Sequence, residues 1–105
     1  MDAKDVLPAK WQYDKNYLPR VLYDDGDYSF IWGKFQNILA LGARWNNSFP
    51  SQGANPTWYV EPDFVAIAIL QRLLTNALDT EDMLYYNNIQ FAIEELTTKM
   101  ATKVP

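Results

Sequence analysis

The side chains with the clearest binding chemistry lie between positions 44 and 61, within the stretch LGARWNNSFPSQGANPTWYVE. An arginine there presents a planar guanidinium whose donors match the oxygens of a carboxylate or a phosphate. Neighbouring tryptophans and amides would add ring faces, donors and acceptors. The candidate set for binding a ligand or a partner is Arg44, Trp45, Asn46, Gln52, Asn55, Trp58 and Glu61.

Arg44 also has a structural interpretation, as a brace that pairs with Glu61, Asp63 or loop carbonyls and holds residues 46–56 against a sheet. Perturbed ion pairs are often structural rather than functional, so we favour the brace. The polar loop predicted over 46–56 likewise has a functional and a structural interpretation. Long loops in small domains often carry function, but such a loop can also satisfy its own polar groups.

Two groups of carboxylates could do other chemistry. Asp24, Asp25 and Asp27 have the oxygen ligands that Ca²⁺ and Mg²⁺ prefer, but the register of a calcium-binding loop is missing, and DDGD is typical of a tight turn. Glu61 and Asp63 could act as an acid/base pair, although acids are common at helix starts for electrostatic reasons alone. We therefore predict neither a metal site nor a catalytic pair.

The composition removes several classes of enzyme. The 105 residues include no cysteine and no histidine, which excludes thiol catalysis and cysteine-ligated metals and removes the commonest general base. The sequence also contains no nucleophile elbow and no phosphate-binding loop. We expect a protein that is not an enzyme and that needs no cofactor.

The charge and the hydropathy of the chain limit the classes of partner that it could bind. Thirteen acidic and nine basic residues give a net charge of −4, which disfavours binding to nucleic acid and suits basic partners. The longest apolar run, FVAIAIL at 64–70, is too short to cross a bilayer, and the first residues lack the pattern of a signal peptide. We expect a soluble, cytoplasmic protein that does not bind membranes.

Strand patterns occupy residues 20–61. Aromatic and β-branched residues suit a pleated surface, and in YSFIWGKF alternate side chains would face opposite sides of a sheet. Tyr59 and three of the tryptophans lie on or next to these strands, and any of them left exposed would mark an interface. The expected elements are a hairpin over 20–35, a strand over 38–45, a loop over 46–56 and a short strand over 57–61.

Two helices should follow the strands. The first is predicted over about 62–78, with Pro62 in its first turn and with first two turns that are apolar on nearly all sides. The second should be capped by Asp79 or Thr80. The prediction is a single α+β domain over 1–105, with an irregular arm over 1–19, an antiparallel sheet of three or four strands over 20–61, and two helices over 62–103 packed on one face.

Three stretches carry a resemblance to known proteins: LGARWN, NPTWYV and PDFVAIAIL. Together, over about 38–74, they resemble a pattern in small uncharacterised bacterial proteins of the kind found on mobile gene cassettes. That group has no assigned activity. The resemblance implies a shared fold and a shared surface around Arg44, and it implies no catalytic residue.

These observations leave two classes of function in competition. The first is a small acidic interaction module of adaptor or inhibitor type, which binds a protein partner and associates with itself, with a homodimer as one form. The alternative is a small-molecule or anion binder that uses Arg44 and the 46–56 loop. Acidity, aromatic content and the lack of histidine and cysteine favour the first.

Overall fold

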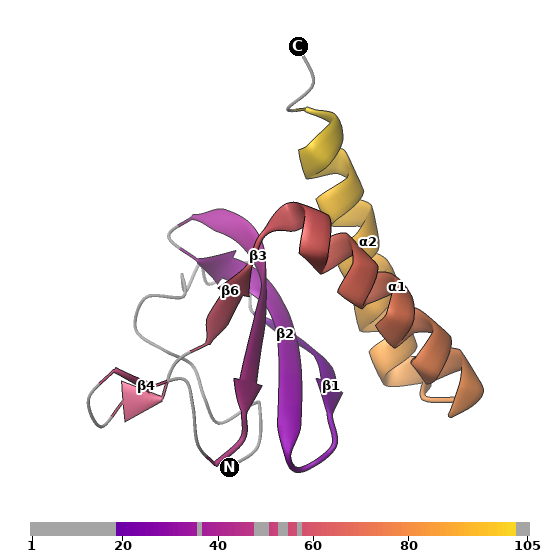
Figure 1. The fold of residues 1–105 in the computed structure, drawn as a ribbon. Coiled ribbons are helices and arrows are strands. Elements are labelled where there is room, and N and C mark those ends of the chain that lie inside the picture. The colour runs from indigo at the N-terminus through magenta and orange to yellow at the C-terminus, as the bar shows by residue number, and fades with distance from the viewer. Residues whose placement is uncertain (1–18, 36, 48–50, 53–54, 57, 103–105) are drawn as a thin grey trace.

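The computed structural model describes residues 19–35, 37–47, 51–52, 55–56 and 58–102. The elements in these ranges are strands β1 (Arg20–Asp24), β2 (Tyr28–Phe35), β3 (Ile38–Trp45), β4 (Ser51–Gln52), β5 (Asn55–Pro56) and β6 (Tyr59–Glu61), and helices α1 (Asp63–Asp79) and α2 (Met83–Ala101) (Figure 1). The predicted α+β class, with an antiparallel sheet followed by two helices, is confirmed. The arm predicted over 1–19 lies outside the described residues, apart from Pro19.

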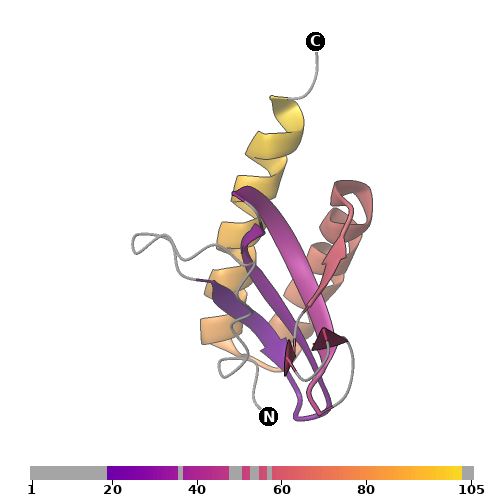
Figure 2. The ribbon, with the colours of Figure 1, turned by 90° about the vertical axis from the view of Figure 1, so that its left-hand side faces the viewer.

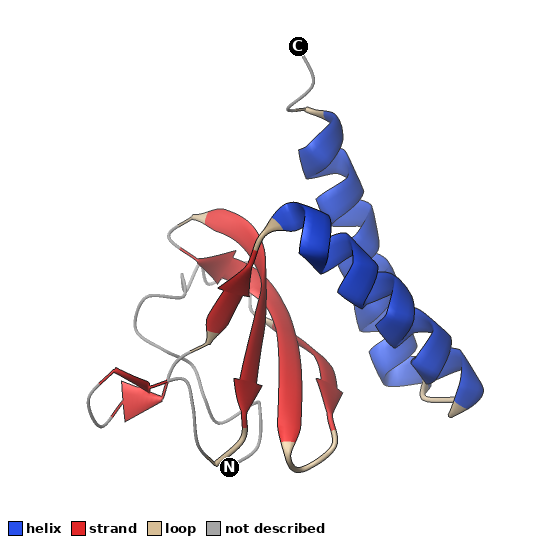
Figure 3. Cartoon of the chain, in the orientation of Figure 1, coloured by secondary structure: helices blue, strands red, loops and turns tan. Residues whose placement is uncertain are grey.

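The main sheet of the described chain has the order β1-β2-β3-β6, and all neighbouring strands are antiparallel. Both helices lie on one side of this sheet, as predicted (Figures 2 and 3). One expectation was wrong: residues 46–56 are not loop throughout, because β4 and β5 form a separate two-stranded pair. Asparagine, serine and proline dominate this segment, and that composition hides short strands.

Strand alternation gives the sheet two unlike faces. On the side of the helices, called here the helix face, Leu22, Trp32 and Leu41 are fully buried against apolar residues of α1 and α2. The helix residues of this core are Ala66, Leu70, Leu73, Ala77, Ile89, Ala92 and Leu96. The opposite side, called the far face, carries a smaller buried group of Ile31, Ala40 and Trp58.

Lys99 joins the sheet and both helices at one point. Its ammonium, carried by α2, donates to the carbonyl oxygen of Leu39 on β3 at 2.8 Å and to Oδ1 of Asp63, the first residue of α1, at 2.9 Å. Both charged side chains are about four-fifths buried, with exposures of 17% and 20%. Water screens such a pair much less than a surface pair, so the contact fixes the end of α2 over β3.

The other half of α2 is held against β1 by an amide hydrogen bond and a cation–π contact. Nδ2 of Asn88 donates to the carbonyl of Val21 at 2.9 Å, and the guanidinium of Arg20 lies 3.7 Å from the ring centroid of Phe91. These contacts place α2 across the sheet from β1 to β3.

The junction between the helices differs from the prediction. Neither Asp79 nor Thr80 caps α2; Thr80 ends α1, and the cap of α2 is Asp82, whose side chain accepts from the N–H of Tyr85 at 3.0 Å. Glu81 has a φ of 57° and occupies the left-handed position that follows a helix end. The N–H groups of Glu81 and Asp82 bond back to carbonyls in the last turn of α1.

Glycine is preferred at such a position because a Cβ makes the left-handed conformation unfavourable. We expect Glu81→Gly to raise the free energy of unfolding by about 0.5–1 kcal/mol. Glu81→Ala, which removes the same carboxylate but keeps the Cβ, is the matched control and should give no gain. Urea unfolding followed by circular dichroism measures both; equal effects of the two variants would show that the backbone conformation is not the cause.

Candidate functional site

Strand alternation divides the predicted binding residues between the two faces of the sheet. Arg44 and Trp58 lie on the far face, while Trp45 and Glu61 lie on the helix face. Residues 52 and 55 pair through their backbones in β4 and β5, and their side chains lie outside the described part of the structure. The seven residues therefore do not form one site.

Arg44 is almost closed to solvent, with 2% of its surface exposed. Its Nε donates to the carbonyl of Trp45 at 3.2 Å, and its guanidinium carbon lies 5.9 Å from the ring centroid of Trp58. Burial lowers the pKa of Arg44. An anion from solvent would have little access to this side chain.

The two carboxylates expected to brace Arg44 do not do so. Glu61 pairs with Leu41, three residues along β3 from Arg44 and on the other face of the sheet. Asp63 lies beyond Glu61 and pairs with Lys99. This part of the brace hypothesis was wrong, because it ignored strand alternation, whereas a main-chain carbonyl beside the loop does accept from Arg44.

Asn46 ties the end of β3 to the β1–β2 turn. Its Nδ2 donates to Oδ1 of Asp24 at 2.8 Å, and its backbone N–H donates to the carbonyl of Asp27 at 2.9 Å. Oδ1 of Asn46 accepts from the hydroxyl of Ser29, and both side chains are buried. Each polar group of Asn46 named here bonds within the protein, which supports a structural role for this candidate.

The aspartates of the β1–β2 turn bond to the turn itself. Asp24 accepts from the N–H of Gly26 at 2.9 Å, and Oδ1 of Asp25 accepts from the N–H groups of Asp27 and Tyr28, both at 2.8 Å. These bonds hold the pKa of Asp25 below its ordinary value. The turn interpretation of DDGD is supported by this arrangement.

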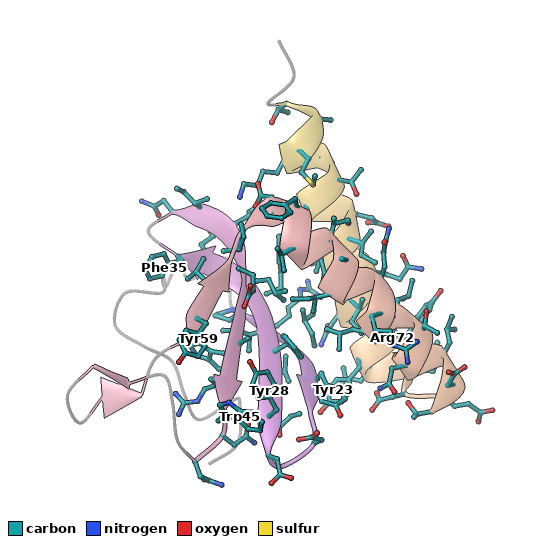
Figure 4. All side chains as sticks on the ribbon, in the orientation of Figure 1. Tyr23, Tyr28, Phe35, Trp45, Tyr59 and Arg72 are labelled. Carbon is teal, nitrogen blue, oxygen red and sulfur yellow. The ribbon has the colours of Figure 1, made fainter. Side chains whose placement is uncertain are left out.

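Three aromatic rings form a partly exposed surface on the helix face, called here the aromatic strip: Tyr28 on β2, Trp45 on β3 and Tyr59 on β6 (Figure 4). The rings of Tyr28 and Trp45 meet edge to face, with centroids 4.6 Å apart. Tyr59 pairs with Ala43, two residues from Trp45 on the same face. Trp45 is 53% exposed and Tyr59 is 50% exposed, although the same face is covered by helices at Trp32 and Leu41.

Acidic groups surround the aromatic strip. Glu61 lies two residues from Tyr59 on the same face of β6. Burial raises the pKa of Tyr28, and the neighbouring Glu61 and Tyr59 raise it further. The turn carboxylate of Asp25 accepts from the N–H of Tyr28. Exposed rings beside carboxylates favour cationic groups, because the ring face and the carboxylate both attract positive charge.

Only one of the three residues, Trp45, belongs to the set predicted from the sequence. Alternation along β2 puts Tyr28 on the same face as Phe30 and Trp32, and Tyr28 was not among the predicted binding residues. Tyr59 was named among the aromatics that would mark an interface if exposed, and it is 50% exposed. Strand alternation identifies the face, but the extent of helix cover decides which rings stay exposed.

A hollow with a volume of about 450 Å³ lies between α2 and the start of β3. Leu39 and Phe91 are among its apolar lining residues. Its lining polar groups largely serve the fold: Lys99 bonds to Leu39 and Asp63, and Glu95 accepts from Nε1 of Trp32 at 3.0 Å. The aromatic strip is therefore the stronger candidate site.

Comparison with known proteins finds no matching family model, no similar curated protein and no similar solved structure. The resemblance to small bacterial proteins stays a prediction. Within the described ranges, no three histidine, cysteine or carboxylate side chains gather closely enough to hold a metal ion. No helix among these residues is both long enough and apolar enough to cross a bilayer.

We expect Arg44→Met to lower the free energy of unfolding by about 1.5–3 kcal/mol, the range for hydrogen bonds made by a charged group. Methionine keeps most of the apolar stem but removes the donor to the carbonyl of Trp45. Denaturant unfolding measures the difference. A neutral or stabilising effect would contradict the structural role and would direct attention to anion binding at Arg44.

Asp25 should make folding depend on pH. Its folded-state pKa lies below the ordinary value of 3.8, so its stabilising contribution is fully present above that value and is lost as the pH falls through the lower folded-state pKa. Asp25→Asn keeps an oxygen acceptor for the turn and should remove this part of the acid sensitivity. Asp27→Asn removes a charge from the same turn and serves as the control.

The measurement is the midpoint of urea unfolding at several pH values between about 2 and 6. The profile of Asp25→Asn should be flatter than those of the wild type and Asp27→Asn. Three parallel profiles would show that Asp25 is not the source.

Proposed function

We propose that this protein is an interaction module of adaptor or inhibitor type, and that it captures a basic protein partner through the aromatic strip. The observation that carries the proposal is the half-exposure of Trp45 and Tyr59 beside Tyr28, on a face that is otherwise buried by helices. Tryptophan and tyrosine are enriched among the residues that dominate binding energy at protein interfaces.

The strip offers a partner rigid contact area. Tyr28 bonds through its backbone to the turn carboxylate of Asp25, and its ring packs against Trp45 and, at 5.3 Å, against Phe30. Rings held in this way lose little conformational freedom on binding, so more of their contact energy appears as affinity.

The chemistry of the partner follows from charge. The chain carries a net charge of −4, and Glu61 and the turn aspartates adjoin the strip. A partner that presents arginine or lysine next to apolar side chains complements both the carboxylates and the ring faces. Complementary charge also speeds the encounter between the two proteins.

The alternative, an anion or small-molecule binder that uses Arg44, has less support. Its central residue is 2% exposed and bonds to a main-chain carbonyl. Its second tryptophan, Trp58, is buried in the far-face core. Binding at Arg44 would require this face to open.

Peptide display against the immobilised protein tests the proposal. We expect the selected peptides to combine arginine or lysine with aromatic or aliphatic residues. Trp45→Ala should weaken the best peptide by about 2 kcal/mol or more, which is about 30-fold, because it removes the central ring. Leu84→Ala truncates a residue that is 69% exposed on α2 and is the matched control, which should bind normally.

Circular dichroism should show that both variants keep the native fold, since Trp45 and Leu84 are exposed. Selection of acidic peptides, or equal losses in the two variants, would contradict a basic partner at the strip. If the wild type instead self-associates through Trp45, the strip is a contact between copies rather than a site for a basic protein.

A further inference from the structure

The two outer strands of the sheet, β1 and β6, are protected very differently. The carbonyl of Val21 on β1 accepts from Asn88 at 2.9 Å, and the carbonyl of Asp24 accepts from the hydroxyl of Tyr85 at 3.5 Å. Both donors belong to α2. The register also shifts between Val21 and Tyr23, and such irregularities discourage pairing with another strand.

The hydrogen-bond pattern shows which groups of β6 point outward. In an antiparallel pair, residues that exchange bonds alternate with residues that turn their N–H and C=O the other way. The N–H of Asn46 donates to the carbonyl of Asp27, so the bonded pairs of β2 and β3 include Ile31 with Gly42. Gly42 therefore faces β2, and its other neighbour, Val60, turns its backbone groups away from the sheet.

The same alternation of inward and outward backbone groups holds at β1, the protected edge. Ile31 faces β3, so its β1 partner Val21 must point outward. Asn88 reaches the carbonyl of Val21 from outside the sheet, as this requires. The assignment for Val60 thus rests on a pattern that an independent contact supports.

The outward N–H and C=O of Val60 have no hydrogen-bond partner in the described part of the chain. The residue is 42% exposed, and its side chain is apolar. A charged or proline residue at this position would discourage another strand from pairing, and the sequence has neither. β6 is thus an edge that can accept one more strand.

We infer that β6 pairs with β6 of a second copy of this chain, antiparallel and around a two-fold axis through Val60. In this register the N–H of each Val60 donates to the C=O of the other Val60. Tyr59 then lies opposite Glu61 of the second copy, so no like charges face each other. A self-complementary register of this kind is what a two-fold contact requires.

The contact is small and the association should be weak. β6 has three residues, and the register makes one bonded pair, well below the contact of a permanent dimer. Both copies carry a net charge of −4, so added salt should strengthen the pairing by screening their repulsion. Binding of a basic partner at the aromatic strip should respond to salt in the opposite way.

The test is sedimentation equilibrium over about 10 µM to 1 mM, a range that suits weak association. We expect the wild type to dimerise, and Val60→Pro to weaken the dimer by about tenfold or more. Proline is tolerated on an edge strand where the lost N–H faces solvent, and here that N–H makes no bond to β3. Val60→Lys places a charge at the same edge and should have the same effect.

Ile38→Lys is the matched control, because Ile38 is an exposed apolar strand residue, at 58%, that does not belong to β6. It should dimerise like the wild type. If Val60→Pro fails to fold, Val60→Lys and the concentration dependence of amide exchange at Val60 in the wild type decide the question. A wild type that stays monomeric throughout, or a Val60→Lys variant that dimerises normally, would overturn the inference.

The dimerisation test can fail or succeed independently of the proposed peptide binding at the aromatic strip. Trp45→Ala should dimerise normally while losing its peptides, and Val60→Lys should keep peptide binding while losing the dimer. A loss of dimerisation in Trp45→Ala instead would place the contact at the strip.

Discussion

One ammonium group joins the sheet to both helices. Lys99 bonds at once to a carbonyl of β3 and to the first residue of α1, and it is itself part of α2. Because the pair is largely buried, loss of Asp63 or of Lys99 would leave the other charge without compensation. Asn88 holds the other half of α2 to β1. These contacts keep the helices over the middle of the sheet, where Trp32 and Leu41 are buried, and leave Trp45 and Tyr59 half exposed.

Much of the fold could be predicted because its signals are local. Aromatic and β-branched residues alternate along β2, and the first two turns of α1 are apolar on most sides, as expected for a helix packed against a sheet. The helix junction was mispredicted because Thr80, followed by acids, is typical of a helix start, and the residue with positive φ is Glu81 rather than glycine. The β4–β5 pair has no alternating apolar pattern that could reveal it.

The candidate site was harder to predict, because exposure is set by contacts between distant parts of the chain. The alternation of side chains along a strand already puts Arg44 and Trp45 on opposite faces. Nothing in the local sequence shows that Arg44 is buried while Trp45 is half exposed. Tyr28 and Tyr59 join Trp45 only through the register of three strands. Asn46 was grouped with the ligand-binding residues because its partner Asp24 lies 22 positions earlier, and no local pattern reveals that bond.

The buried bonds of Asn46 have a consequence for recognition. They fasten the end of β3 to the β1–β2 turn, and Asn46 and Asp27 are the chain neighbours of Trp45 and Tyr28. Ordering a flexible surface during association consumes part of the attraction between two molecules. Here the hydrogen bonds of Asn46 order this part of the sheet when the chain folds, so binding of the proposed partner would not have to order it. Binding of this kind would be that of a preorganised surface, whose backbone changes little between the free and the bound protein.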